Sequence, residues 1–113
     1  MTVSNVTDIG PIIHLSAKYI NAFGYIERRK YLDGSLAVAL ITWTNSEFEP
    51  DHILVSVNLG SYGVSAAKDC FYVKTYSEHE GLADALVTTG LFKMTGTTTV
   101  GAYGTWFVEM QFV

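Results

Sequence analysis

The chain has 113 residues, a formal net charge of −4, and 16% charged against 49% hydrophobic residues. This balance argues against intrinsic disorder and against general nucleic-acid binding, because both are associated with a higher charge density. The length predicts a single domain, residues 1–113, that can bury a core without disulfide bonds. The chain has a single cysteine, which cannot form an internal disulfide. The first residues carry neither a basic region nor a long apolar run, so we expect a soluble cytoplasmic protein.

The first quarter of the chain is predicted to enter an antiparallel sheet. Alternation of apolar and polar residues over 12–20, with Ile13, Leu15, Ala17 and Tyr19 on one side, predicts a half-buried strand; a short amphipathic helix entered at Pro11 is the alternative. Residues 21–32 contain a basic run that we expect on a solvated strand or loop face.

Two hairpins are expected next. Asp33 and Gly34 separate two strand-like segments, which predicts a two-residue hairpin turn with positive φ at both positions. Residues 36–43 are apolar on both faces and predict a central strand covered on both sides. A polar turn at 45–51 then leads into residues 52–59, whose alternation predicts the neighbouring strand.

The predicted helix lies in the second half. Ser77 and Glu80 have the spacing of a capping box, in which each side chain hydrogen-bonds the other residue's backbone N–H, and Gly90 is a typical helix end. The helix is therefore expected at about residues 78–89. Its apolar stripe, which should pack on one face of the sheet, comprises Leu82, Ala83, Leu86 and Val87.

Strands flank this helix. A Gly/Ser/Ala loop at 60–69 precedes a strand at 71–76, residues 91–99 are rich in threonine, and Gly101 and Gly104 frame a turn. Alternation predicts a last strand, residues 105–112, which we expect at a sheet edge. Strands and helices do not alternate along the chain, so the predicted fold is α+β: a mainly antiparallel sheet of six or seven strands with one helix packed on one face.

Catalytic and metal-binding patterns are weak. Cys70 and His79 are separated by a strand and a helix start, so we read Cys70 as a structural, buried residue. His79 and Glu80 resemble the start of a metalloprotease helix, but that motif needs a second histidine where Ala83 stands. We therefore expect no enzyme activity, no catalytic residues, no metal and no cofactor.

Surface chemistry is the stronger signal. Tyrosine and arginine dominate interface hot spots because they bury a large area and keep a polar group. The alternative is that the tyrosines are ordinary half-buried sheet residues. The residues predicted to bind a partner are the acidic turn Glu47, Glu49 and Asp51, the tyrosines Tyr62, Tyr72 and Tyr76, and the arginines Arg28 and Arg29.

Three segments resemble the DUF4313 family of small uncharacterised proteins of bacteriophages and mobile elements. They are YLDGSLAVAL at 31–40, VSVNL at 55–59 and LADALVTTGLF at 82–92, the last followed by Thr95 and Gly96. The resemblance covers about half of the chain and brings no catalytic residues with it. It implies a phage or plasmid setting, in which small acidic proteins often inhibit host defence by covering a protein surface.

Together these observations predict a non-enzymatic protein-binding module that inhibits a host defence complex. The expected partner is a host protein such as a CRISPR effector or another defence nuclease, bound in the bacterial cytoplasm without direct contact to nucleic acid or membrane. The acidic turn would face basic residues of such a partner. The alternative is a homo-oligomeric structural or accessory protein, a homodimer in the simplest case, formed through the strand at 105–112.

Overall fold

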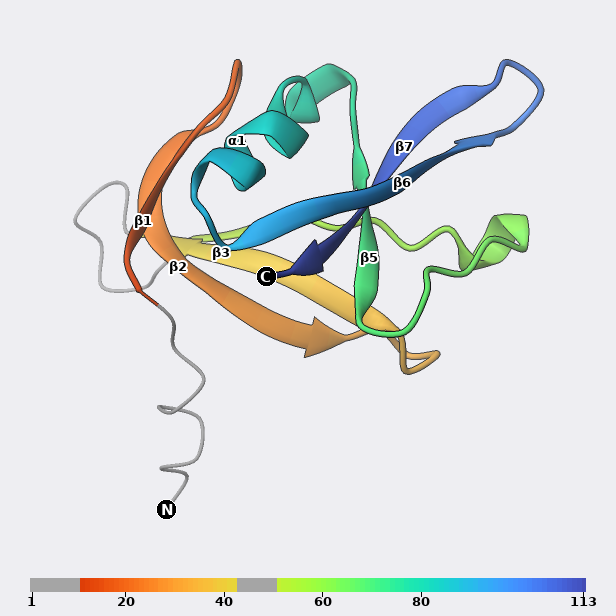
Figure 1. Cartoon of the computed structure of the whole chain (residues 1–113), viewed down its shortest axis with the longest axis horizontal. Coiled ribbons are helices and arrows are strands. Elements are labelled where there is room, and N and C mark those ends of the chain that lie inside the picture. The colour runs from red at the N-terminus through yellow and green to blue at the C-terminus, as the bar shows by residue number, and fades with distance from the viewer. Residues whose placement is uncertain (1–10, 43–50) are drawn as a thin grey trace.

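The computed structural model describes residues 11–42 and 51–113. Within them the chain forms seven strands, one α-helix and two 3-10 turns (Figure 1). The mainly antiparallel α+β architecture expected from the sequence is confirmed. The elements are β1 (Ile13–Ser16), β2 (Asn21–Lys30), β3 (Leu36–Thr42), β4 (Asp51–Leu54), η2 (Gly60–Tyr62), β5 (Cys70–Lys74), η3 (Ser77–His79), α1 (Leu82–Thr88), β6 (Phe92–Val100) and β7 (Thr105–Phe112).

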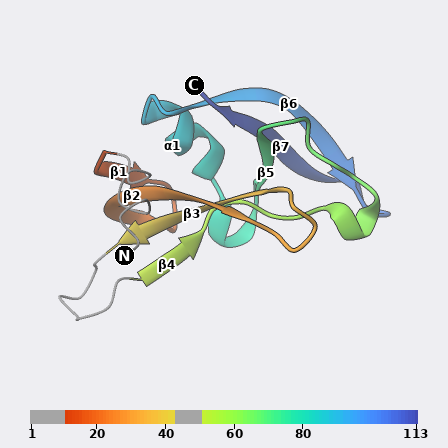
Figure 2. The same ribbon diagram turned by 90° about the horizontal axis from the view of Figure 1, so that it is seen from below.

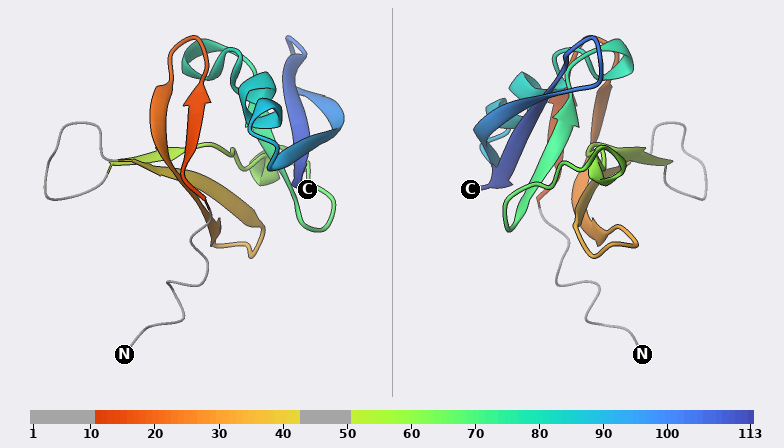
Figure 3. Two further views of the ribbon diagram at one scale, coloured as in Figure 1. Left: turned by 60° about the vertical axis from the view of Figure 1, so that its left-hand side comes forward. Right: turned by 90° about the vertical axis from the view of Figure 1, so that its right-hand side faces the viewer.

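The strands form two sheets instead of the single sheet we expected. The first sheet has the order β1-β2-β3-β4 and the second has the order β5-β7-β6. Figure 2 shows the two groups of strands apart, and in Figure 3 α1 lies between them at one end. The helix contacts β1 of the first sheet and β5 and β6 of the second. The helix therefore closes one end of a core that both sheets share.

The centre of the first sheet is β3. Its residues after Leu36 are all buried, as predicted for a strand covered on both sides. Val38 and Leu40 face the main core, where Leu15, Phe71 and Leu82 are also buried. The two outer strands of this sheet are shorter than predicted: β1 ends at Ser16, and β4 ends at Leu54. Tyr19, assigned to the buried side of the longer strand, is 61% exposed as a result.

The β2–β3 hairpin differs from the predicted turn. Tyr31 N–H donates to the Ser35 carbonyl, and Gly34 N–H donates to the Tyr31 carbonyl, both at 2.9 Å. The loop is therefore three residues long, Leu32 to Gly34, and only Gly34 has a positive φ, at 87°. This is a type I turn closed by a left-handed glycine, the common alternative to the two-residue turn.

The helix is shorter than predicted and begins differently. Residues Ser77–His79 form a separate 3-10 turn, because Glu80 takes an extended ψ of 127° before the α-helix begins at Leu82. No capping box forms, and the Glu80 side chain instead pairs with Lys18 at 3.3 Å. Gly90, with φ of 82°, follows the helix end as expected. Val87, assigned to the apolar stripe, is 39% exposed, and Ala85 is buried in its place.

The second sheet places β7 in its centre. Residues Cys70–Lys74 pair with one side of β7 and Phe92–Val100 with the other, so the expectation that residues 105–112 form an edge strand is wrong. The sheet is covered on both faces near its middle: Phe71 and Met110 join the main core, whereas Tyr72 and Phe107 pack with Leu59 in a second cluster. Within the described residues, no helix has the length and apolarity needed to cross a membrane.

Candidate functional site: a seam cleft and a projecting hairpin

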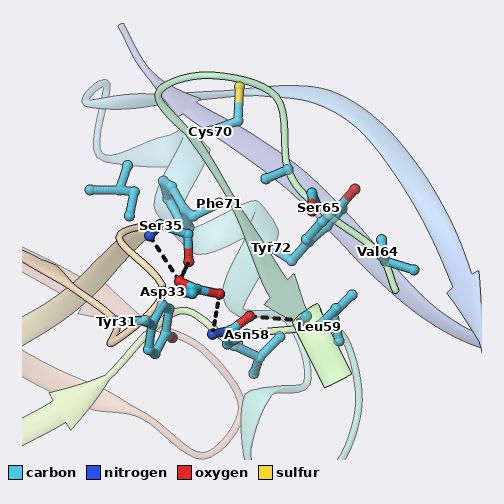
Figure 4. Close-up of a pocket in the computed structure, with 14 residues that line it drawn as sticks. Tyr31, Asp33, Ser35, Asn58, Leu59, Val64, Ser65, Cys70, Phe71 and Tyr72 are labelled. Atoms are coloured by element: carbon cyan, nitrogen blue, oxygen red, sulfur yellow. Dashed lines mark hydrogen bonds between the residues drawn. The ribbon is translucent and has the colours of Figure 1, made fainter. Parts of the chain in front are cut away.

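A small cleft opens where the two sheets meet. It lies between the β2–β3 hairpin and residues 57–66, with Cys70, Phe71 and Tyr72 of β5 as its base (Figure 4). Its volume of about 70 Å³ is room for about two water molecules. The cleft is therefore too small to hold a metabolite-sized substrate.

The polar groups of the cleft bind one another. Asp33 Oδ1 accepts from the Ser35 backbone N–H at 2.9 Å and from Ser35 Oγ at 2.5 Å, and Asp33 Oδ2 accepts from Asn58 Nδ2 at 3.2 Å (Figure 4). The Ser35 hydroxyl and then its N–H, followed by Asn58, lower the pKa of Asp33. The carboxylate is thus a saturated acceptor that joins the hairpin to the segment after β4.

A second polar contact lies deeper in the same seam. The Tyr31 hydroxyl and Ser56 Oγ are 2.7 Å apart, and Ser56 Oγ also accepts from the Val38 N–H at 2.9 Å. Ser56 is fully buried, and burial raises the pKa of Tyr31. Cys70 is buried as expected, and its burial raises the pKa of the thiol, which disfavours the nucleophilic thiolate. These features identify the cleft as a structural seam between the sheets.

The acidic turn is only partly placed. Glu47 and Glu49 lie outside the described residues, and Asp51 is the exposed first residue of β4. Tyr62 lies in η2 and is 63% exposed. Tyr76 follows β5, is 43% exposed, and packs edge-on against the Phe107 ring.

Three further residues predicted to bind a partner, Tyr72, Arg28 and Arg29, do not lie together on one surface. Tyr72 is only 9% exposed, because residues 57–66 cover its face of β5, so the structure removes it from the available surface. Arg28 and Arg29 are consecutive in β2 and therefore project to opposite faces of the first sheet. Arg29 bonds Glu27 and His52, whereas the Arg28 guanidinium stacks over the Phe112 ring. The predicted set therefore does not form one site.

The β6–β7 hairpin carries an exposed surface that the sequence pattern did not single out. In Figure 1 it projects from the body of the molecule to the upper right, away from α1. Tyr103 in its turn is 98% exposed, Trp106 is 57% exposed and Met94 is 45% exposed. Thr99 pairs with Trp106 and Thr97 with Val108, which places these side chains on the same face as Met94 and Met110. We call Met94, Thr97, Thr99, Tyr103 and Trp106 the hairpin surface.

The position of Trp106 explains why the pattern missed it. Trp106 is in phase with Val108, Met110 and Phe112, so alternation alone places it on the same face as the buried Met110. Met110 is fully buried, but the hairpin continues past the point that the core covers, so Trp106 is left in solvent. Only the tertiary arrangement shows how far along β7 the core extends.

The outer side of β6 is an open strand edge. Its residues from Lys93 to Thr97 are exposed, and no further strand pairs with β6 in the described part of the chain. A β-bulge interrupts the β6–β7 register between Met94 and Gly96, where the Thr95 hydroxyl donates to Glu109 at 2.7 Å. Bulges at edges limit unwanted pairing, and here the bulge leaves residues 97–100 as the regular stretch.

Other chemistry is sparse. Among residues 11–42 and 51–113, no group of three His, Cys, Asp or Glu side chains could hold a metal ion. His79, expected near the helix start, is 7% exposed, and its Nδ1 has no hydrogen-bond partner. Comparison with known proteins found no matching family model, no matching curated protein and no matching solved structure. The functional argument therefore depends on the surface geometry of this chain.

Proposed function

We propose that the chain is a non-enzymatic protein-binding module that contacts its partner through the hairpin surface. The observation that carries this proposal is the exposure of Trp106, Tyr103 and Met94 on one projecting hairpin. Aromatic residues and methionine are enriched where protein interfaces bury their centres, and a few such residues supply most of the binding free energy. A rigid antiparallel hairpin holds them in place without a large loss of entropy on binding.

The proposed partner is a host protein, and the proposed effect is inhibition. The resemblance of residues 31–40, 55–59 and 82–92 to small phage and mobile-element proteins favours a host defence complex, such as a CRISPR effector or another defence nuclease. Such an inhibitor would act in the bacterial cytoplasm and would cover a protein surface without binding nucleic acid or membrane. The acidic residues Glu47, Glu49 and Asp51 would add charge complementarity to a basic partner, an effect that salt weakens.

A pull-down with a matched variant tests the proposal. The tagged wild type, a Tyr103→Ser/Trp106→Ser variant and a Tyr62→Ser control are each applied to nuclease-treated lysates of bacteria that carry defence systems. Tyr62 is a fair control because it is 63% exposed and lies on η2 instead of the hairpin. We expect the wild type and the control to retain the same protein and the hairpin variant to lose it.

A purified reconstitution then tests inhibition. The captured defence complex is assayed for target cleavage with and without each variant, at two salt concentrations. Inhibition by the wild type and the control, but not by the hairpin variant, supports the proposal. Equal capture or equal inhibition by all three variants contradicts it.

A homodimer is the second candidate, and the open edge of β6 favours it. Two copies could pair their β6 edges, with residues 97–100 as the regular stretch. Light scattering over a concentration series tests this directly, and Thr97→Lys should reverse any dimer by placing a charge at the edge. A monomer at high concentration removes the candidate.

A further inference from the structure

A second surface feature lies at the other end of β7. There a groove of about 280 Å³ opens between β2, the turn after α1 and the last residues of β7. Its walls are mainly apolar and include Ile26, Leu91, Phe112 and Val113. Tyr103 and Trp106 of the hairpin surface lie at the Thr105 end of the same strand, so these two aromatic residues and the groove occupy opposite ends of the second sheet.

Among the described side chains that line the groove, Arg28 is the charged one. The guanidinium carbon lies 3.9 Å from the centre of the Phe112 ring, and the residue is exposed. Within the described residues, no carboxylate lies within ion-pair distance of Arg28, whereas Lys18, Arg29 and Lys74 each have one. Stacking on an aromatic ring fixes the plane of the guanidinium and leaves its N–H edge free for a planar anion.

The two properties of the groove specify a ligand. An apolar floor favours an aliphatic side chain, and the volume suits about one such residue with its backbone. A fixed guanidinium at the rim favours a carboxylate, which it can bind through two parallel N–H···O bonds. The positive charge of Arg28 has no carboxylate partner among the described residues, so a carboxylate of an acidic segment would complement it locally.

We infer that this groove binds an acidic peptide segment of a partner protein, in which an aliphatic residue is followed by an aspartate or glutamate. The aliphatic side chain lies against Ile26 and Leu91, and the carboxylate pairs with Arg28. This inference goes beyond the proposed function, because it concerns a second contact site that does not require the hairpin surface.

A titration followed by NMR tests the inference. The probe is the capped peptide acetyl-Gly-Ile-Asp-Gly-amide, added to the full ¹⁵N-labelled chain. We expect saturable shifts at the Gly90 and Leu91 amides and at the Arg28 Nε–H. The same peptide with asparagine in place of aspartate should bind about tenfold more weakly, since it loses a charge-assisted pair of hydrogen bonds.

Matched variants locate the interaction. Arg28→Gln should weaken binding of the aspartate peptide at least about tenfold, whereas Arg29→Gln, on the opposite face, should leave it unchanged. Arg28→Lys should give an intermediate affinity, because lysine keeps the charge but loses the stacked fork. The amide spectrum of each variant reports whether that variant is folded. If a variant is not folded, the comparison of the aspartate and asparagine peptides on the wild-type chain still tests the inference.

Four outcomes would overturn the inference. They are no saturable shift with the aspartate peptide, equal affinity for the asparagine peptide, and unchanged binding by a folded Arg28→Gln variant. The fourth is occupancy by something else. Binding of octanoate in preference to the peptide would assign the groove to a lipid-like anion, and shifts on concentrating the protein alone would assign it to a second copy.

Discussion

β3 and β6 are the two extremes of this molecule. β3 has seven residues, of which all but Leu36 are buried, whereas β6 has nine residues and buries only Phe92 and Val100. β3 is paired on both sides, and β6 has a pairing partner on one side within the described residues. The comparison separates two kinds of strand: one holds the two sheets on a common core, and the other presents threonine side chains and a backbone edge to solvent.

The largest effect is expected in β3. Leu40 is fully buried in the main core, so Leu40→Ala removes buried apolar atoms and leaves a cavity. We expect a loss of about 2–5 kcal/mol in the free energy of unfolding. Urea denaturation followed by tryptophan fluorescence measures it, and a loss no greater than that for a surface residue would contradict the central position of β3.

The seam contact to β3 should come next. Ser56→Ala leaves the buried Val38 N–H without its acceptor and removes the partner of the Tyr31 hydroxyl. An unpaired buried donor costs about 1–3 kcal/mol, so we expect a loss of stability in that range. Tyr31→Phe keeps the Val38 bond and is the matched control, for which we expect a smaller loss. Equal losses for the two variants would show that the Val38 bond contributes nothing.

His79 should make stability depend on pH. Burial lowers the pKa of the His79 ring below its ordinary value of 6.5. Of the smaller contributions, Glu78 raises this pKa, Lys74 lowers it, and a backbone hydrogen bond with Leu54 raises it. Well above pH 6.5 the His79 ring is neutral in the folded and the unfolded chain, so its protonation does not reduce the free energy of unfolding there. As pH falls below 6.5 the unfolded chain binds a proton first, and stability decreases with a limiting slope of about 1.4 kcal/mol per pH unit.

One variant isolates this titration. His79→Gln should flatten the loss of stability that begins as pH falls below about 6.5. At lower pH the lowered pKa values of Asp33 and Glu78 add their own loss of stability as the carboxylates are protonated. Urea denaturation at a series of pH values provides the measurement. An unchanged slope in His79→Gln would refute the assignment.

The smallest effect is expected in β6, and the same Thr→Ala change made in β3 provides the comparison between the two strands. Thr97→Ala removes an exposed hydroxyl and should change stability by no more than about 0.5 kcal/mol. Thr42→Ala in β3 removes a buried hydroxyl that donates to the Phe23 carbonyl at 2.5 Å, and should cost about 1 kcal/mol or more. Differential denaturation of the two variants checks the contrast, and equal effects would remove the distinction between the strands.

The sequence predicted those structural features that depend only on residues adjacent in the chain. The apolar run of β3 and the position of Gly90 were correct, because burial on both faces and a left-handed helix end each leave a pattern in adjacent residues. The capping box did not form, because Ser77 has a positive φ of 59° and Glu80 has an extended ψ of 127°, and the Glu80 side chain contacts Lys18, 62 positions away in the sequence. A competing partner at that separation leaves no signal near Ser77.

The candidate site was predictable only in part. Tyr72 and Tyr76 have the same phase in the strand pattern, yet Tyr72 is 9% exposed and Tyr76 is 43% exposed, because an irregular segment covers one and not the other. Trp106 matched the core pattern and is exposed for the converse reason. Irregular coverage and the reach of a hairpin are tertiary properties, so alternation could not distinguish these residues.

The central place of β7 has a consequence during synthesis. β5 and β6 are not paired to each other, and both obtain their ladder hydrogen bonds from β7, which follows them in the chain. On the ribosome the second sheet therefore cannot form until residues 105–112 have emerged, whereas the β2–β3 hairpin can close as soon as it is made. The nascent chain would pass through a stage in which two strand edges of the second sheet are open, which is when chaperones bind such segments.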